Sequence, residues 1–321
     1  MGIWGGETMK KYISLRLFFI LVNLFIVVTV YYFGLEFATN EKYYHLPFDD
    51  YFSNTVENYK EYLSNIFLHN DWGLSNEGDP VWEILVPRII LSTKYNIIAL
   101  LFYLPAGIIV GFATAYFYGT WFDKAVNWIL LVLSSIPTYI FISLLILTLG
   151  FYVPIFHYQY VEGYTIRNYL LPIFALSLWP IMTFARIVRG EILAMNKSAF
   201  VLLARVKGLS RFQTTLRHVL KNCVVAILPE IPTVFLFTLT GTFFVEIIYS
   251  IEGVGELMFW SLLQLGPFGV YYVFVDMNIM MVVSLYYVSA ALIVSFLSDI
   301  SYRLFDPRIR IGGTNKPVSN D

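Results

Sequence analysis

Residues 95–117 have the sequence YNIIALLFYLPAGIIVGFATAYF, which is 23 residues long and contains no charged side chain. The hydrocarbon core of a bilayer is ~30 Å thick, and a helix needs about 20 apolar residues to cross it. This stretch is therefore long enough and apolar enough to form a transmembrane segment. We expect it to be helical, because lipid offers the backbone no hydrogen-bond partners.

Five further segments of the chain resemble this one in length and apolar character. They are residues 17–35, 125–149, 170–187, 224–248 and 277–300. The whole chain agrees with them, since 58% of its 321 residues are hydrophobic and only 13% are charged. A soluble domain has about 25% charged residues. The sequence therefore predicts an all-α polytopic membrane protein with about six transmembrane helices.

The composition also excludes several classes of function. The 21 Lys and Arg residues are balanced by 22 Asp and Glu residues, so no basic excess favours nucleic-acid binding. Cys223 is the single cysteine, and His45, His69, His157 and His218 lack metal-ligand spacing. The chain has no Gly-x-x-x-x-Gly-Lys-Ser/Thr motif for ATP phosphates. We expect no catalytic residue, no metal site and no cofactor bound by this chain.

The charged residues between the predicted helices are sorted by side. Residues 36–86 contain ten acidic and two basic side chains, whereas residues 186–222 contain eight basic side chains and one acidic side chain. Basic residues also precede the first helix and follow the last one. An excess of Lys and Arg marks cytoplasmic loops. We therefore expect both termini in the cytoplasm and the acidic loop outside.

These patterns divide the chain into segments of different predicted character. A cytoplasmic N-terminus is followed by the first transmembrane helix, an extracytoplasmic loop, the remaining transmembrane helices and a cytoplasmic tail. The boundaries are 1–16, 17–35, 36–94, 95–300 and 301–321. Met9 is an alternative to Met1 as the first residue of the chain.

The extracytoplasmic loop contains one predicted amphipathic helix. Val56, Tyr59, Leu63 and Ile66 recur at spacings of three and four residues, which places them on one helix face. This helix lies on the membrane surface or caps the transmembrane bundle, or else it docks a soluble partner.

A helical hairpin with a basic surface is predicted within residues 188–222, hereafter the basic hairpin. Residues 198–206 are predicted to form its first helix, and Gly208 suits a left-handed C-terminal cap. Ser210 and Gln213 have the spacing of a capping box, which starts a second helix that ends near Leu220. The hairpin either docks a partner protein or anchors the loop to lipid.

The sequence of this hairpin resembles the cytoplasmic signature of ABC importer permeases. The similar residues are 204–210 (ARVKGLS) and 216–222 (LRHVLKN), and the likeness is greatest to B-type permeases of oligopeptide, dipeptide and nickel transporters. Four more segments follow that family's order: 71–75 (DWGLS), 119–124 (GTWFDK), 246–255 (EIIYSIEGVG) and 306–310 (DPRIR). Two residues depart from it, because Leu202 and Leu203 stand where the family has Glu and Ala.

The resemblance implies an ABC type I importer permease fold in a bacterial cytoplasmic membrane. The implied partners are a second homologous permease, two ABC ATPase subunits that use ATP and Mg, an extracytoplasmic solute-binding protein and membrane lipid. Peptide is the implied solute, and nickel, metal chelates and glutathione-like compounds remain alternatives. An ATP-independent transporter or channel with a lipid-binding basic loop is a further alternative. The residues implied to couple the permease to its ATPases are Ala204, Arg205, Lys207, Gly208, Leu209, Ser210, Arg217 and His218.

Two acidic residues in the fifth predicted helix are candidates for the translocation pathway. Glu230 is flanked by Pro229 and Pro232, which interrupt the helical hydrogen bonds there. Glu246 lies at the outer end of the same helix, where it either faces a cavity or caps the mouth in water. For Glu230 the alternative is a structural partner near the inner interface, because charges inside a membrane also persist where they are paired.

Overall fold

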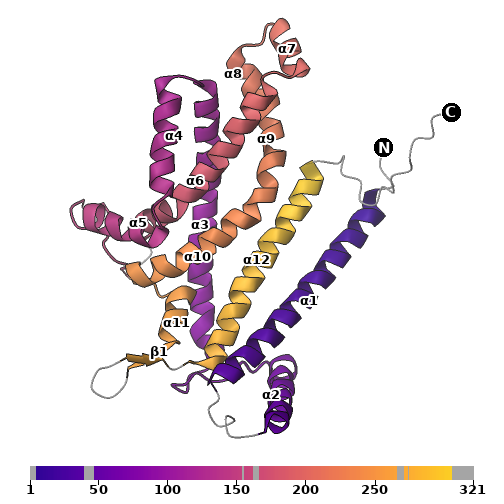
Figure 1. Ribbon diagram of the computed structural model, residues 1–321, viewed down its shortest axis with the longest axis vertical. Helices are drawn as coiled ribbons and strands as arrows, with labels where there is room; N and C mark the ends of the chain where they lie inside the picture. The colour runs from indigo at the N-terminus through magenta and orange to yellow at the C-terminus, as the bar shows by residue number, and fades with distance from the viewer. Residues whose placement is uncertain are drawn as a thin grey trace, which may run out of the picture. The chain divides into compact units, whose positions relative to one another are not determined.

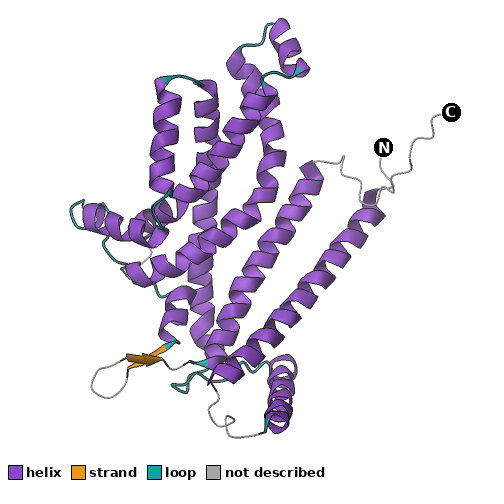
Figure 2. Cartoon of the chain, in the orientation of Figure 1, coloured by secondary structure: helices purple, strands orange, loops and turns teal. Residues whose placement is uncertain are grey.

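The computed structural model describes residues 5–39, 47–153, 155–161, 166–265, 271–273 and 275–305. Helices account for nearly all of these residues (Figure 2). Within these ranges, five helices are long and apolar enough to cross a membrane, and a bent helix pair makes a sixth candidate. The predicted all-α membrane class is therefore confirmed, with one short β-hairpin that the sequence analysis did not predict.

The chain forms two compact units, each made from three separate stretches. Unit 1 contains residues 1–102, 136–178 and 236–292, and unit 2 contains residues 103–135, 179–235 and 293–321. Four long helices contribute residues to both units: α3 (Val81–Tyr116), α6 (Arg167–Met195), α10 (Ile231–Tyr249) and α12 (Met277–Phe305).

In unit 1, the first two helices, α1 (Gly5–Thr39) and α2 (Phe48–His69), pack through aromatic side chains. Tyr59 is buried against Tyr32, and its hydroxyl lies 2.6 Å from the Thr29 hydroxyl. The predicted amphipathic face is confirmed, because Tyr59 is buried and the other three residues of that face are half-buried, whereas Lys60 and Glu61 are exposed. The helix ends at Asn70, whose φ of 53° is left-handed.

Helix α3 begins at Val81, within the segment that was predicted to be an extracytoplasmic loop up to residue 94. At 1.5 Å per residue its 36 residues span about 54 Å, which exceeds the ~30 Å of a bilayer core. Its N-terminal end is buried in unit 1 against α11 (Val254–Trp260) and the start of α12. Tertiary packing therefore extends the helix beyond its apolar core. A two-stranded antiparallel hairpin, β1 (Leu263–Leu265) and β2 (Tyr271–Val273), follows α11.

The single helix predicted over residues 125–149 is wrong. Helix α4 (Trp121–Ser134) ends where Ser135 turns its hydroxyl back onto the carbonyl of Leu131 at 2.7 Å. A new helix, α5 (Thr138–Leu145), starts after Pro137, and the chain bends by 101° between the two. Proline lacks an N–H group and keeps the preceding residue out of the helical region, so one helix cannot continue through this point.

In unit 2, two glycines of α3 allow α6 to approach closely. A Cβ atom at Gly107 would lie 2.7 Å from the Cβ of Phe184, and one at Gly111 would lie 2.6 Å from the carbonyl oxygen of Ala185. Small residues at such spacing are the usual device for close helix packing in membranes. Unit 2 also contains α7 (Ala199–Val206) and α8 (Arg211–Thr214), which lie beyond the C-terminal end of α6, and α9 (Leu220–Ile227), which runs back toward α10 (Figure 1).

Candidate functional site

The turn of the basic hairpin has the geometry that the sequence predicts. Gly208 has a φ of +87°, and its N–H donates to the carbonyl of Arg205 at 2.9 Å. The N–H of Leu209 donates to the carbonyl of Ala204 at 3.2 Å. These two bonds form a Schellman motif, which satisfies carbonyl groups at the end of α7. The predicted left-handed cap is confirmed.

The second half of the hairpin begins with the predicted capping box. The Ser210 hydroxyl accepts from the backbone N–H of Gln213 at 3.2 Å, and the Gln213 side chain accepts from the N–H of Ser210 at 3.3 Å. The predicted end near Leu220 is wrong, because a π-helical turn (Thr215–Val219) carries the helix directly into α9. A helix without a break transmits displacement better than a flexible connector does.

An aromatic contact attaches the hairpin to α3. The Phe212 ring meets Phe112 edge-on at 5.6 Å and Tyr116 at 6.1 Å between centroids. The Arg211 guanidinium lies over the Tyr116 ring at 5.3 Å. Aromatic pairs of this geometry contribute about 0.5–1.5 kcal/mol beyond the area that they bury. The sequence does not predict this contact, since the partners are about a hundred positions apart and no local spacing connects them.

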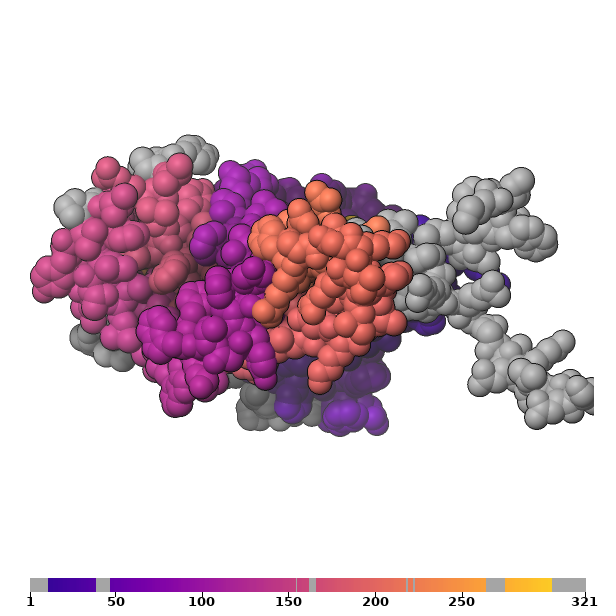
Figure 3. All heavy atoms as spheres, turned by 90° about the horizontal axis from the view of Figure 1, so that it is seen from above, coloured from indigo at the N-terminus to yellow at the C-terminus, as the bar shows by residue number. Residues whose placement is uncertain are grey.

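The outward surface of the hairpin combines apolar and basic side chains. Val201 and Ala204 are buried, whereas Val206 is 83% exposed and Leu202 and Leu203 are more than half exposed. Figure 3 views the molecule from the hairpin end, where α7 and α8 form an uncovered surface. Of the predicted coupling residues, Leu209 is half-buried and the side chain of His218 lies outside the described residues. The exposed ones are Arg205, Lys207, Gly208, Ser210 and Arg217.

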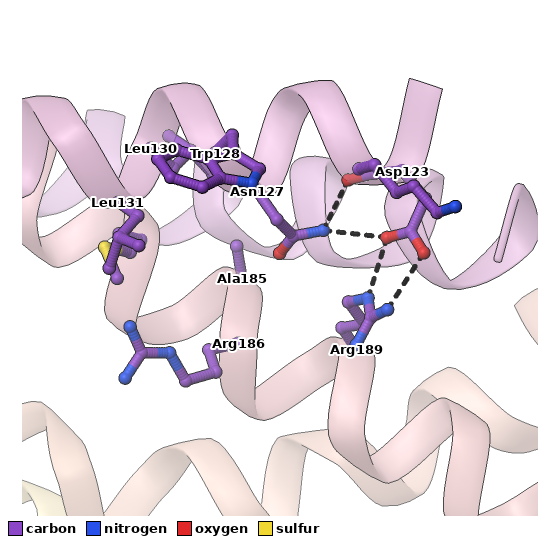
Figure 4. Close-up of a pocket in the computed structure, with 10 residues that line it drawn as sticks. Asp123, Asn127, Trp128, Leu130, Leu131, Ala185, Arg186 and Arg189 are labelled. Carbon is purple, nitrogen blue, oxygen red and sulfur yellow. Dashed lines mark hydrogen bonds and ion pairs between the residues drawn. The ribbon is translucent and has the colours of Figure 1, made fainter. Parts of the chain in front are cut away.

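A bidentate ion pair connects α4 to α6, six residues before the end of α6. Nε and Nη2 of Arg189 each lie 2.9 Å from an oxygen of the buried Asp123 carboxylate. Asp123 also accepts from the backbone N–H of Gly119 at 3.1 Å and from the Asn127 side chain at 2.7 Å. All these groups are drawn in Figure 4, apart from the Gly119 backbone. Thr120 caps α4 through the N–H of Asp123, so the Thr-x-x-Asp spacing was the available sequence signal.

Glu246 is enclosed by hydrogen-bond donors in unit 1. The side chain is 1% exposed, and its carboxylate accepts from the Ser92 hydroxyl at 2.5 Å and from the N–H of Gly255 at 2.6 Å. The Ser92 hydroxyl in turn accepts from the N–H of Val254 at 2.8 Å. One of these donors, the N–H of Gly255, belongs to the first turn of α11, whose backbone N–H groups have no partner within the helix. Glu246 therefore does not cap the mouth in water, as one alternative had it.

The glycines after Glu246 are explained by the same contact. A Cβ atom at Gly255 would lie 2.8 Å from the Glu246 carboxylate and 2.7 Å from the Cα of Phe243. A Cβ atom at Gly253 would overlap the carboxylate directly.

Glu230 differs from Glu246, because it ends a 3₁₀ turn (Leu228–Glu230) and is exposed. The two pathway candidates therefore differ in burial.

A cavity of about 490 Å³ in unit 1 has a strongly acidic lining. Among the residues that line it, Arg88 is the only basic one, and it forms an ion pair with Glu256 at 2.8 Å. The other carboxylates that line it belong to Glu77, Asp79, Glu252 and Asp276. The cavity therefore suits a positively charged group.

Residues 104–311 match the protein family described as "Binding-protein-dependent transport system inner membrane component". The chain is 26% identical over 263 residues to a putative peptide transport system permease protein of Brucella abortus (strain 2308), covering 80% of each chain. It is 26% identical over 317 residues to the dipeptide transport system permease protein DppB of Lactococcus lactis subsp. cremoris (strain MG1363), covering 94% of this chain and all of that one.

A third relative is the dipeptide transport system permease protein DppB of Bacillus subtilis (strain 168), which is 27% identical over 273 residues and covers 84% and 83% of the two chains. A solved structure of the MetNI methionine ABC transporter, described as inward-facing, aligns with 70% of this chain and 94% of that chain. The TM-score is 0.50 and the identity is 16%. This last likeness concerns the fold alone.

Proposed function

Because the chain belongs to the family of binding-protein-dependent transport system inner membrane components, we propose that it forms half of the translocation pathway of an ATP-driven importer. The solute is a peptide, since the relatives that match the chain over most of its length are named peptide and dipeptide permeases. A solute-binding protein delivers the peptide outside a bacterial cytoplasmic membrane. The acidic cavity of unit 1 suits a basic group on that side.

The observation that carries the proposal is the basic hairpin. Its exposed leucines and Val206, next to Arg205 and Lys207, form the mixed surface that a docking helix offers to a protein groove. Phe212 fixes the hairpin to α3, and Arg189 fixes α6 to α4. Movement of a docked partner would therefore shift helices as rigid bodies.

The remaining parts of the importer follow from this arrangement. A second homologous permease completes the pathway, and two ABC ATPase subunits bind the hairpins and supply ATP and Mg. This chain is then a permease without an ATPase site of its own. The hairpin and both termini lie in the cytoplasm, as the basic charge of the hairpin predicts.

Purification of the chain from its native membrane in mild detergent tests the assembly. We expect two ATPase subunits for each pair of permeases, and peptide-stimulated ATP hydrolysis after addition of the solute-binding protein. Recovery of the chain without any ATPase would support the ATP-independent transporter instead.

The side of the membrane on which the basic hairpin lies is tested with a Lys207→Cys variant and a membrane-impermeant thiol reagent. The native Cys223 is buried and contributes little background. We expect labelling from the cytoplasmic side only. Labelling of intact cells from outside would contradict the proposed topology.

A further inference from the structure

A cavity of about 470 Å³ lies in unit 2 between α4 and α6, next to the Asp123–Arg189 pair (Figure 4). Its volume is within the range of about 300–1,000 Å³ that is usual for small-ligand sites. Neither the hairpin contacts nor the proposed peptide pathway accounts for it. Its lining divides into a charged part and an apolar part.

The charged part of the lining has an excess of two positive charges. Lys124, Arg186 and Arg189 carry three, and Asp123 carries one negative charge. Asp123 is already committed to Arg189 through both carboxylate oxygens. Lys124 and Arg186 are exposed, and their side chains have no hydrogen bond or ion pair to any residue that the structure describes. Two cations at one cavity without a counter-charge favour an anionic ligand.

The apolar part of the lining continues into the exposed face of α4. Leu131 and Met182 line the cavity beside the cations. Trp128 also lines it and is 67% exposed, and Ile129 and Val132 next to it are more than half exposed. Tryptophan is enriched where a membrane protein meets the headgroup region. A ligand with an anionic head and an apolar tail would satisfy both parts.

We propose that this cavity binds the anionic headgroup of a phospholipid. The phosphate pairs with Arg186 and Lys124, and the acyl chains lie along the exposed apolar face of α4. Basic pockets between transmembrane helices are known to hold anionic headgroups. The Asp123–Arg189 pair holds the two helices at the spacing that the headgroup requires, without neutralising the binding cations.

The test uses the complete importer in vesicles that contain equal amounts of phosphatidylglycerol and phosphatidylcholine. A photo-crosslinking amino acid replaces Trp128, and mass spectrometry identifies what it captures. We expect phosphatidylglycerol adducts in clear excess over phosphatidylcholine adducts. Arg186→Gln and Lys124→Gln should each lower that excess about fivefold, as expected for one cation near the membrane surface.

Arg167→Gln is the matched control. It removes the same charge from an exposed arginine at the other end of α6. It should leave the excess unchanged. Inorganic phosphate at millimolar concentration distinguishes the source of the phosphate group. If it abolishes the phosphatidylglycerol excess, the site takes free phosphate and the lipid proposal fails. Capture of the second permease, equal capture of both lipids, or an excess that survives Arg186→Gln with Lys124→Gln would also overturn it.

Discussion

Replacing Gly208 by valine perturbs the hairpin turn through its backbone conformation alone. The φ of Gly208 is +87°, and a Cβ atom built there meets nothing within 4 Å. The substitution therefore causes no clash, and the left-handed region costs an L-residue about 1–2 kcal/mol. A β-branched side chain lies at the upper end of that range. We expect the native turn to lose roughly a factor of 5–30 in population relative to alternatives.

The assay is peptide uptake together with ATP hydrolysis by the reconstituted importer. If the turn positions the hairpin on the ATPase, Gly208→Val should lower uptake per ATP hydrolysed while the permease still inserts and assembles. Gly208→Asn should recover most of the coupling, because asparagine tolerates the left-handed region. The matched control is Gly190→Val, at a helical glycine that also has free space around it. Normal uptake by Gly208→Val, or equal losses in the Val and Asn variants, would refute the reasoning.

Three further predictions concern contacts that hold the helices together. Arg189→Ala leaves the Asp123 carboxylate without its ion-pair partner and should lower the free energy of unfolding by about 2–3 kcal/mol. Breaking a fully buried pair costs ~3–5 kcal/mol, and the loss is smaller here because Arg189 is partly exposed. Glu246→Ala leaves buried donors unsatisfied and should cost about 2–4 kcal/mol, measured by thermal unfolding in detergent, with little change in peptide affinity. Gly111→Val forces a Cβ against the Ala185 carbonyl and should cost at least about 1–3 kcal/mol, seen as a lower unfolding temperature and lower yield.

Each of these changes has a control of the same kind. Arg167→Ala removes an exposed arginine of the same helix that lies outside the cavity, and it should alter stability by no more than about 0.5 kcal/mol. Gly34→Val adds the same side chain to a helical glycine with no neighbour within 4 Å. Glu230→Ala removes an exposed carboxylate near the start of α10. If a control destabilises the protein as much as its test variant, the contact named for that variant is not the cause.

Local features of the fold could be predicted from the sequence because their partners are near in the chain. The Gly208 cap and the Ser210–Gln213 capping box depend on residues three to five positions apart, and both were predicted correctly. The amphipathic face of α2 follows in the same way from a spacing of three and four residues. The all-α membrane class could be predicted from the length and composition of the apolar segments alone.

One local feature was missed although its signal is in the sequence. Pro137 ends the straight helix that was predicted over residues 125–149, but the uninterrupted apolar composition outweighed it there. Hydropathy measures the free energy of leaving water and is insensitive to backbone direction. The bend is therefore caused by the backbone hydrogen bond that proline cannot form, and amino-acid composition does not predict it.

The sequence by itself determined that this chain crosses a membrane, and it predicted where its hairpin turns. Only the tertiary structure decided what Glu246 and Asp123 do. Glu246 meets Ser92 across 154 positions of the chain, and Asp123 meets Arg189 across 66. Such pairs form because a charge excluded from water must find a partner wherever folding brings one. No periodicity or motif in the sequence specifies that partner.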